Sequence, residues 1–515
     1  MTNQPNQNRE RRRVALIILD GWGVGPRNAG NPIARAKLET INSLEDNFPA
    51  CTLQASGIAV GLPWQEEGNS EVGHLTLGGG RVIYQNFMKI TAAIRDGSFF
   101  TNQTLLDVME RAKGATLHLV GLVGEGVVHS SFDHLEALIS LAERLGVNWR
   151  VQAISDGKDS APRRALSALG KLPHDRIGSV SGRAYAMDRD GKPERISEAW
   201  KAMTDRGTGA ESAARVIENA YARGFGDEFV PPTPIGEPSQ RVKPGDAVIF
   251  FNFREDGLRA LVEMFESSRD ELPVAMVTMV PYGSELDATG AFRQETVANS
   301  VGEVIAQRGA AQLRVAESEK RAHVTYFFNG FREEPFEGEY RVIIPGKRVA
   351  RHDEAPEMMA EEVTTRILTA LEEKRYGFVL ANYANPDMIA HTGNFDATLR
   401  AVETVDQELG KLVEGARKTG TLLVITADHG NAERLLDART GRAETRHDAS
   451  PVPFYLVGEE FRLPEPKPPE KRLRSEREPL GTLADVAPTI LELMGIEKPI
   501  EMTGRSLLSK LIGAQ

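Results

Sequence analysis

Two metal-binding residue types stand side by side in the segment TADHGNAE, residues 426–433. Asp428 and His429 follow the apolar run 422–425, which predicts a buried strand. Open α/β sheets place their chemistry at the carboxyl ends of strands. A carboxylate and an imidazole held at such an end are typical ligands of a transition metal. Taken alone, Asp-His-Gly also fits a turn with a hydrogen-bonded histidine, so the prediction depends on matching residues elsewhere.

Two further segments supply matching residues. VALIILDGWG, residues 14–23, predicts a second apolar strand that ends at Asp20, and the glycines after it allow a sharp turn. TRHDASPVP, residues 445–453, places His447 in a polar loop before another apolar stretch. A single histidine in a loop is more often a surface residue than a ligand, so neither segment is sufficient alone.

A helical segment completes the set. In NPDMIAH, residues 385–391, Asn385 suits a helix N-cap and Pro386 the first helical position. Asp387 and His391 are then four residues apart, on one face of a helical turn. Three carboxylates and three imidazoles could supply two metal sites of mixed nitrogen and oxygen ligands, which favours Mn²⁺ or Zn²⁺ over Ca²⁺.

Ser70 in GNSEVGH, residues 68–74, is a candidate nucleophile. One interpretation is a helix N-cap, because a serine followed by an acidic residue is common there. The other interpretation uses the same position. A helix start favours a bound anion, and coordination to a metal lowers the pKa of a hydroxyl, so that serine becomes nucleophilic without a histidine base.

Together these segments resemble the 2,3-bisphosphoglycerate-independent phosphoglycerate mutases, a family of the alkaline phosphatase superfamily. Other blocks resemble the same family in the same order, and the similarity covers the chain from about Val14 onward. These blocks are VVHS at 127–130, DGKD at 156–159, SGR at 181–183, AMDRD at 186–190, FNFR at 251–254, EK at 319–320, AHVT at 322–325 and the tail 483–507.

The resemblance implies a role for each matching residue. One manganese ion would be held by Asp387, His391 and His447. The other would be held by Asp20, Ser70, Asp428 and His429, with Ser70 as the catalytic nucleophile. The phosphoglycerate would be bound by His129, Lys158, Asp159, Arg183, Arg189, Arg254 and Lys320. Physical chemistry is consistent with these roles, because arginine binds carboxylate and phosphate through paired hydrogen bonds.

The implied reaction interconverts 3-phosphoglycerate and 2-phosphoglycerate in glycolysis and gluconeogenesis, through a phosphoserine at Ser70. Two divalent ions would assist, most simply Mn²⁺, with Zn²⁺, Co²⁺ or Mg²⁺ as alternatives, and no 2,3-bisphosphoglycerate is required. Domain closure would exclude water from the phosphoserine. Two alternatives stay open at this point: a metal-dependent phosphatase or mutase of another small phosphorylated acid, and an inactive homologue that binds phosphorylated ligands.

Two residues depart from the family pattern. Lys158 stands where the family block has arginine, and lysine lacks the planar fork. Gly257 stands where a second substrate-binding arginine is expected after Arg254. Either one contact is lost, or Arg259 replaces it, or the substrate differs. A charge-assisted hydrogen bond contributes about 1.5–3 kcal/mol, so one to two orders of magnitude in affinity depend on this position.

The pattern along the chain predicts an α/β protein with mostly parallel sheets. Predicted strands are 14–19, 117–123, 149–154, 247–251, 274–280, 342–345, 378–382 and 422–426, and predicted helices include 134–144, 358–374 and 397–414. For Asp20 and Ser70 to meet Asp428, both ends of the chain must fold together. We therefore expect a discontinuous phosphatase-like metal-binding domain of residues 1–84 and 299–515, with an inserted transferase-like substrate domain of residues 85–298. Leu77–Arg81 is a predicted linker or hinge.

Composition sets outer limits. The 515-residue chain is long enough for two cores. A net charge of −11 disfavours nucleic acid as the main ligand. No apolar run has the length of a membrane span or a signal peptide, so we expect no membrane association and a cytoplasmic location. The single cysteine, Cys51, excludes an intrachain disulfide. The expected partner is a small phosphorylated substrate, and a monomer is the default expectation.

Overall fold

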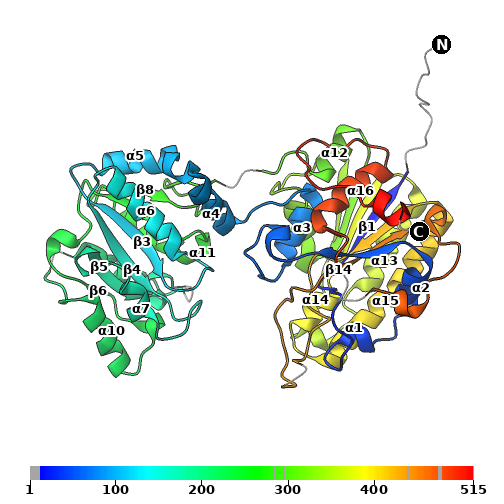
Figure 1. The fold of residues 1–515 in the computed structure, drawn as a ribbon, viewed down its shortest axis with the longest axis horizontal. Helices are drawn as coiled ribbons and strands as arrows, with labels where there is room; N and C mark the ends of the chain where they lie inside the picture. The colour runs from blue at the N-terminus through cyan, green and yellow to red at the C-terminus, as the bar shows by residue number, and fades with distance from the viewer. Residues whose placement is uncertain are drawn as a thin grey trace, which may run out of the picture. The chain divides into compact units, whose positions relative to one another are not determined.

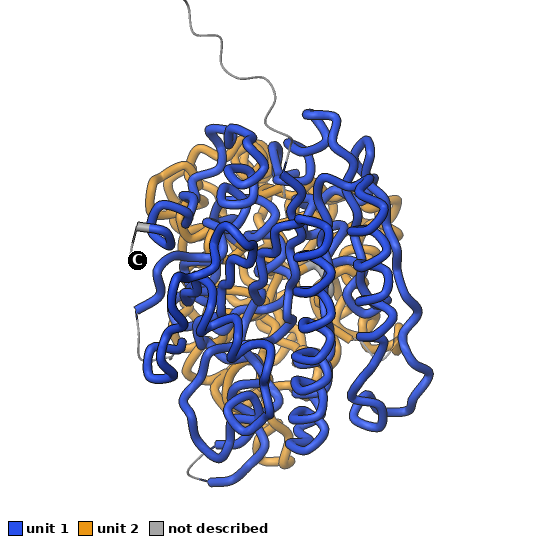
Figure 2. The backbone as a smooth tube through the Cα atoms, turned by 90° about the vertical axis from the view of Figure 1, so that its right-hand side faces the viewer, with its two compact units in different colours: residues 1–84, 295–515 blue, residues 85–294 orange. Residues whose placement is uncertain are grey.

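The computed structural model of the protein describes residues 12–188, 191–205, 207–283, 285–293, 296–437, 440–473 and 478–513. Arg189 lies outside the described residues. The chain divides into two compact units: residues 85–294 form one, and the residues before and after them form the other (Figure 2). The roles that the sequence assigns to the two parts stay predictions. Within the described ranges we find no helix with the length and apolar character that a bilayer span requires.

The discontinuous unit is built on a mixed, mostly parallel sheet (Figure 1). At its centre, β1 (Val14–Leu19) pairs in parallel with β12 (Phe378–Tyr383) on one side and β13 (Leu422–Thr426) on the other. All three central strands are fully buried, as their largely apolar sequences predict. Among the described residues the other strands are β10 (Gln312–Glu317), β11 (Glu339–Ile344), β14 (Val452–Val457), β2 (Ala50–Gln54) and β15 (Gly481–Thr482).

Helices cover both faces of this sheet. On one side α13 (Ala360–Glu373) packs against α15 (Phe395–Thr419) and against β10 and β12. On the other side α12 (Val301–Gln307) packs against α3 (Ser70–Gly79) and α16 (Val486–Leu493), as Figure 1 shows. The remaining described α-helices of this unit are α1 (Pro32–Arg35), α2 (Glu39–Asn47), α14 (Asn385–Ala390) and α17 (Leu508–Gly513).

The second unit has its own core and its own sheet, in the order β6-β5-β4-β3-β7-β8-β9. Every pairing in it is parallel except that of β5 with β6. The strands are β3 (Leu117–Val123), β4 (Trp149–Ser155), β5 (Ile177–Gly182), β6 (Thr233–Pro234), β7 (Ala247–Phe250), β8 (Ala275–Thr278) and β9 (Thr289–Gly290). The described α-helices are α4 (Asn86–Asp96), α5 (Gln103–Arg111), α6 (Phe132–Arg144), α7 (Ala165–Leu169), α8 (Arg183–Ala186), α9 (Pro193–Thr204), α10 (Ala213–Ala222) and α11 (Glu255–Ser267).

The α/β prediction is confirmed, with both sheets mostly parallel. The predicted strands at 14–19, 117–123 and 422–426 have the observed bounds. The predicted linker Leu77–Arg81 is wrong, because its first three residues form the last turn of α3. A Cβ atom on Gly78 would lie 2.0 Å from the carbonyl oxygen of Phe328, so this glycine allows close helix packing and not flexibility.

Candidate metal centre and active site

The three acidic ligand candidates come from three neighbouring strands of one sheet. Asp20 directly follows β1, Asp428 is the second residue after β13, and Asp387 lies in α14, which begins just after β12. Because these strands run parallel and in register, their carboxyl ends meet at one edge of the sheet. The structure therefore brings together side chains that are about 400 residues apart in the chain.

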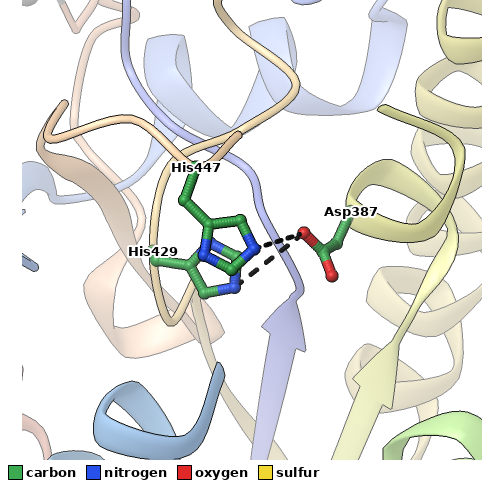
Figure 3. Close-up of side chains that lie close together, drawn as sticks. All are labelled: Asp387, His429 and His447. Carbon is green, nitrogen blue, oxygen red and sulfur yellow. Dashed lines mark ion pairs between the residues drawn. The ribbon is translucent and has the colours of Figure 1, made fainter. Parts of the chain in front are cut away.

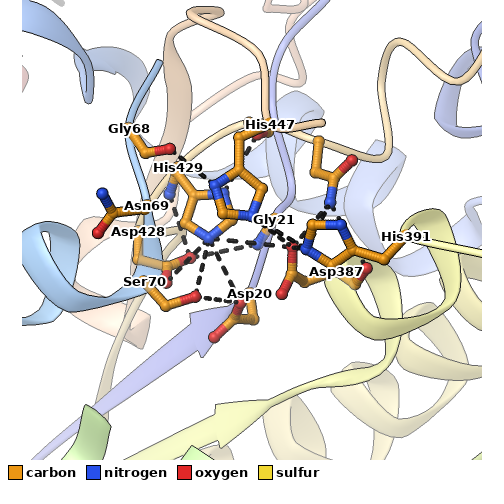
Figure 4. A network of polar contacts seen from close by, with 12 residues as sticks. Asp20, Gly21, Gly68, Asn69, Ser70, Asp387, His391, Asp428, His429 and His447 are labelled. Atoms are coloured by element: carbon orange, nitrogen blue, oxygen red, sulfur yellow. Dashed lines mark hydrogen bonds and ion pairs between the residues drawn. The ribbon is translucent and has the colours of Figure 1, made fainter. Parts of the chain in front are cut away.

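Ser70 belongs to the same cluster. Its Oγ donates to Asp20 Oδ1 at 3.1 Å and lies 2.9 Å from His429 Nε2 (Figure 4). The interpretation of Ser70 as an N-cap is wrong: Asn69 caps α3, its side chain accepting from the Val72 N–H, and Ser70 is the first helical residue. The Ser70 hydroxyl thus makes no capping bond, and lies among the carboxylates and imidazoles.

Two overlapping groups of side chains have the geometry of a metal site. Asp387, His429 and His447 each offer a ligand atom within 4.8 Å of the others, as do Asp20, Asp428 and His429. Figure 3 shows the first group, in which His447 Nε2 lies 3.4 Å from Asp387 Oδ1. His391 adds a further nitrogen, with Nε2 3.2 Å from the same carboxylate oxygen. All six predicted metal-binding carboxylates and imidazoles are therefore brought together with Ser70.

The imidazoles are oriented as metal ligands usually are. Their Nδ1 atoms lie against backbone carbonyls: His391 at 2.8 Å from Thr445 O, His447 at 2.9 Å from Gly68 O and His429 at 3.2 Å from Gly430 O. A proton on each Nδ1 leaves each Nε2 with a lone pair aimed inward. His391 Nε2 and His447 Nε2 are then two acceptors only 3.0 Å apart, an arrangement that needs a cation or a shared proton. The donor set therefore fits a divalent transition metal.

Lys320 lies in the same cluster. Its Nζ donates to Asp20 Oδ1 at 2.6 Å, to Asp387 Oδ2 at 2.8 Å and to Ser70 Oγ at 2.8 Å. Burial alone would lower the pKa of Lys320, but the neighbouring carboxylates raise it well above its ordinary value. The ammonium therefore stays charged beside the serine oxygen. Its predicted role is a substrate contact, which is compatible with this position.

Sequence reasoning missed the residues that hold the ligands in place. His74 Nδ1 lies 2.9 Å from the Ser70 carbonyl oxygen and 3.2 Å from Asp428 Oδ2. Asn382 donates to Asp20 Oδ2 at 2.6 Å, and Asn431 donates to Asp387 Oδ1 at 2.8 Å. His74 follows Ser70 by one helical turn, and that spacing was the available signal. The predicted N-cap role of Asn385 is wrong, because α14 begins at this residue and its amide donates to Pro356 O.

A second polar cluster lies in the other unit, again at the carboxyl ends of parallel strands. His129, Asp159 and Arg183 follow β3, β4 and β5 respectively. His129 Nδ1 lies 2.6 Å from Asp159 Oδ2, and Arg183 Nη1 donates to Asp159 at 2.8 Å and to Asp156 at 2.7 Å. Burial would raise the pKa of Asp159, but its bonds to His129 and Arg183 lower it overall. Asp159 is thus an anionic hydrogen-bond acceptor held in place by an imidazole and a guanidinium.

The other predicted substrate contacts of this unit differ in their surroundings. Lys158 is largely exposed and its Nζ lies 2.8 Å from Glu228 Oε1. Arg254 is exposed, and the preceding residue Phe253 donates its N–H to His129 O at 2.9 Å, so Arg254 adjoins the cluster in the chain. Arg189 lies outside the described residues.

The surroundings of Gly257 bear on the missing arginine at this position. A Cβ atom on Gly257 would lie 2.3 Å from Met187 Cε and 3.7 Å from His129 Cδ2, so this glycine faces the cluster. Arg259 is paired with Glu263 and Glu285, with its Nε 3.0 Å from Glu263 Oε1. To replace the missing arginine, Arg259 would have to give up these two carboxylates.

Known proteins match the chain over nearly its whole length. The model of the Metalloenzyme superfamily matches residues 12–498. A curated 2,3-bisphosphoglycerate-independent phosphoglycerate mutase of Synechococcus sp. is 46% identical and covers 96% of this chain and 95% of its own. The protein of the same name from Clostridioides difficile is 44% identical, and the match covers 96% of this chain and 99% of the relative. A crystal structure of Leishmania mexicana phosphoglycerate mutase at low cobalt concentration matches with a TM-score of 0.66 and 29% sequence identity. The match covers 97% of this chain and 98% of the Leishmania chain.

Protons and metal should compete for the imidazoles. Hydrogen bonding to Asp387 raises the pKa of His391. Burial would lower the pKa of His429, but the carboxylates of Asp428, Asp20 and Asp387 raise it to about 10. The metal-free protein therefore holds protons that a metal ion must displace. We expect Mn²⁺ binding to release protons, and its affinity to fall as the pH falls from about 8 to about 5. Calorimetric titration in buffers of different ionisation enthalpy measures the number of protons released and the affinity for Mn²⁺ at each pH. An affinity that does not change with pH, with no proton release, would contradict the assignment of these imidazoles as metal ligands.

Gly73 allows α3 to approach the Asp428 loop. A Cβ atom there would lie 2.5 Å from Asp428 O and 2.7 Å from Asp428 Cβ. Replacing a glycine inside a helix by alanine ordinarily stabilises by about 0.5–1 kcal/mol. We expect Gly73→Ala to do the opposite, lowering the thermal midpoint and weakening Mn²⁺ binding at least ~10-fold, as changes around metal ligands do. Gly410→Ala in α15, whose Cβ would meet only Thr40 Oγ1 at 3.0 Å, is the control. Equal behaviour of the two variants would refute the prediction.

Proposed function

The chain belongs to the 2,3-bisphosphoglycerate-independent phosphoglycerate mutases, within the Metalloenzyme superfamily, and we propose that Ser70 carries the phosphoryl group in its reaction. The protein is accordingly an isomerase that interconverts 3-phosphoglycerate and 2-phosphoglycerate, a step of glycolysis and gluconeogenesis. A phosphatase or a mutase of another acid is not supported. The position of Ser70 Oγ, within hydrogen-bond distance of Asp20, His429 and Lys320, carries the proposal.

The family and the donor set support binding of divalent metal. We propose two ions, Mn²⁺ in preference to Zn²⁺, Co²⁺ or Mg²⁺. Asp387, His391 and His447 would hold one, and Asp20, Ser70, Asp428 and His429 the other. When bound, such ions neutralise phosphoryl oxygens and lower the pKa of the serine hydroxyl.

The residues of the chain supply attack, charge and orientation. Ser70 Oγ attacks the phosphorus of 3-phosphoglycerate in line, the bond from phosphorus to the 3-oxygen breaks, and glycerate is released from phosphorus. The 2-hydroxyl of glycerate then attacks the phosphoserine, and Ser70 Oγ leaves. Lys320 Nζ, 2.8 Å from Ser70 Oγ, places a permanent positive charge where phosphoryl oxygens gather negative charge.

Substrate binding is proposed for seven residues, which are His129, Lys158, Asp159, Arg183, Arg189, Arg254 and Lys320. Among them Asp159 suits a glycerate hydroxyl, because its carboxylate is ionised and oriented by His129 and Arg183. Arg183 and Arg254 suit the carboxylate and the phosphate. Glycerate must stay bound between the two transfers, because release would leave a phosphoserine open to hydrolysis. We also propose that the protein acts as a monomer.

The decisive assay couples product formation to enolase. The purified protein is stripped of metal with a chelator, given 3-phosphoglycerate, and then supplied with Mn²⁺. We expect no turnover without metal and formation of 2-phosphoglycerate after addition. Release of inorganic phosphate without 2-phosphoglycerate would contradict a mutase.

Ser70→Ala should abolish transfer in the same assay while leaving Mn²⁺ binding largely intact, since six carboxylate and imidazole ligands remain. Removing a nucleophile typically lowers kcat by ~10⁴-fold or more. Ser300→Ala is a matched control, because Ser300 is likewise buried at the start of a helix but its side chain caps α12. Residual turnover of Ser70→Ala near the level of the control would exclude Ser70 as the nucleophile.

Gly257→Arg tests whether this pocket still accommodates a second guanidinium. We expect a KM for 3-phosphoglycerate lower by up to ~10-fold, equivalent to one charge-assisted hydrogen bond, once the flexible end of Met187 moves aside. Gly257→Ala adds the Cβ atom without the guanidinium and should not lower KM. If both variants leave KM unchanged or raise it equally, position 257 does not face bound substrate.

A further inference from the structure

Glu433 is a buried acidic residue next to the metal centre that has no role in the proposed reaction. It lies four residues after His429 and its exposed fraction is 1%. Its Oε2 accepts the N–H of Gly23 at 3.0 Å and the N–H of Asn431 at 2.8 Å. The first N–H belongs to the loop that follows Asp20, and the second to the loop that follows Asp428 and His429. One carboxylate oxygen therefore joins the two loops that carry a shared set of metal ligands.

Three glycines leave room for this side chain. A Cβ atom would lie 2.2 Å from Glu433 Cδ at Gly23, 2.6 Å from Glu433 Cγ at Gly25, and 2.4 Å from Glu433 Oε1 at Gly430. None of these distances is tolerated by real Cβ atoms. Both loops are thus shaped around the carboxylate, and residues with larger side chains at these positions would displace it.

The loop that carries His447 is tied to the same place. Asp448, the next residue, donates its N–H to Gly430 O at 2.9 Å, and Val24 donates its N–H to Pro451 O at 2.7 Å. Ala432 donates its N–H to Gly21 O at 2.9 Å. Three ligand-bearing loops therefore form one hydrogen-bonded unit, with the Glu433 carboxylate inside it.

We propose that Glu433 is a positioning residue of the metal centre, whose carboxylate fixes the spacing between Asp20 and the Asp428–His429 pair. This inference rests on the proposed metal centre. The spacing matters because metal ligands must be held within a few tenths of an ångström, and a loop that moves carries its ligand with it. A carboxyl group is suited to the task because one of its oxygens can accept both N–H groups at once.

A purely structural role would make Glu433 equivalent to any buried glutamate of the same unit. Glu45 offers the comparison. It is also buried, and its carboxylate accepts the N–H of Leu473 at 3.0 Å and the hydroxyl of Tyr455 at 3.0 Å. Neither of these partners belongs to a loop that carries a metal ligand, so changes at Glu45 should affect folding stability alone.

The test compares full-length Glu433→Gln, Glu433→Ala, Glu45→Gln and Glu45→Ala with the wild type. Metal is removed, the thermal midpoint of each metal-free protein is recorded, and the Kd for Mn²⁺ is measured by competition with a fluorescent chelator. We expect Glu433→Ala to raise the Kd by ~10–100-fold, the usual effect of losing a residue that orients metal ligands. Glu433→Gln should raise it less, because its amide oxygen can still accept both N–H bonds. Both Glu45 variants should lower the thermal midpoint with a change in Kd of no more than about twofold.

Two results would overturn the inference. Glu433 is only a structural residue if both of its variants keep the wild-type Kd for Mn²⁺. The same conclusion follows if they change the Kd no more than Glu45 variants with the same thermal midpoint do. The Glu433→Gln variant, being nearly isosteric, keeps the test valid if Glu433→Ala does not fold. If wild-type protein itself fails to bind Mn²⁺ in this assay, the metal centre is refuted, and that failure is distinct from unaltered binding by the variants.

Discussion

Three carboxylates share one buried site, and this accumulation of negative charge is the constraint on which the rest of the centre depends. Asp20, Asp387 and Asp428 are at most 2% exposed and lie at the ends of adjacent strands. Buried like charges are costly unless cations compensate them. Lys320 supplies one positive charge, with hydrogen bonds to two of the carboxylates and to Ser70. The carboxylates also raise the pKa values of His391 and His429, which favours the protonated imidazoles in the metal-free protein. A bound divalent cation would displace the protons from the imidazoles and supply the compensating charge beside the Ser70 hydroxyl.

The sheet explains why such a costly arrangement persists. Parallel strands with largely apolar sequences are buried on both faces, and β1, β12 and β13 pair in register at the centre of the sheet. The charged residues of the site lie just beyond the ends of these strands, and Asn382, near the end of β12, donates to one of them, Asp20. The second unit repeats this logic with different chemistry, since His129, Asp159 and Arg183 follow its own parallel strands. There Arg183 pairs with Asp156 and Asp159, so the negative charge of that cluster is balanced by a cationic side chain of the protein itself.

The sequence was sufficient for those parts of the site that have a local signature. An apolar run followed by Asp20, or by Asp428 and His429, marks a strand end, and the spacing of Asp387 and His391 marks a helical face. Family resemblance added Lys320, which no local pattern singles out. What could not be predicted depends on contacts between distant segments. His74, Asn382 and Glu433 act through partners on other elements, and Gly78 resembles a linker until Phe328 packs against it. The capping predictions for Asn385 and Ser70 failed by one residue, because the neighbouring backbone, and not residue type, decides where a helix begins.

The central claim is that cations bind between the strand ends beside Ser70. It is tested most directly by a crystal structure of the metal-stripped protein soaked in Mn²⁺, with anomalous diffraction used to locate the ions. The account predicts two anomalous peaks, one among Asp387, His391 and His447 and one among Asp20, Ser70, Asp428 and His429. The absence of any peak there, or manganese bound only at sites remote from the Ser70 hydroxyl, would contradict it.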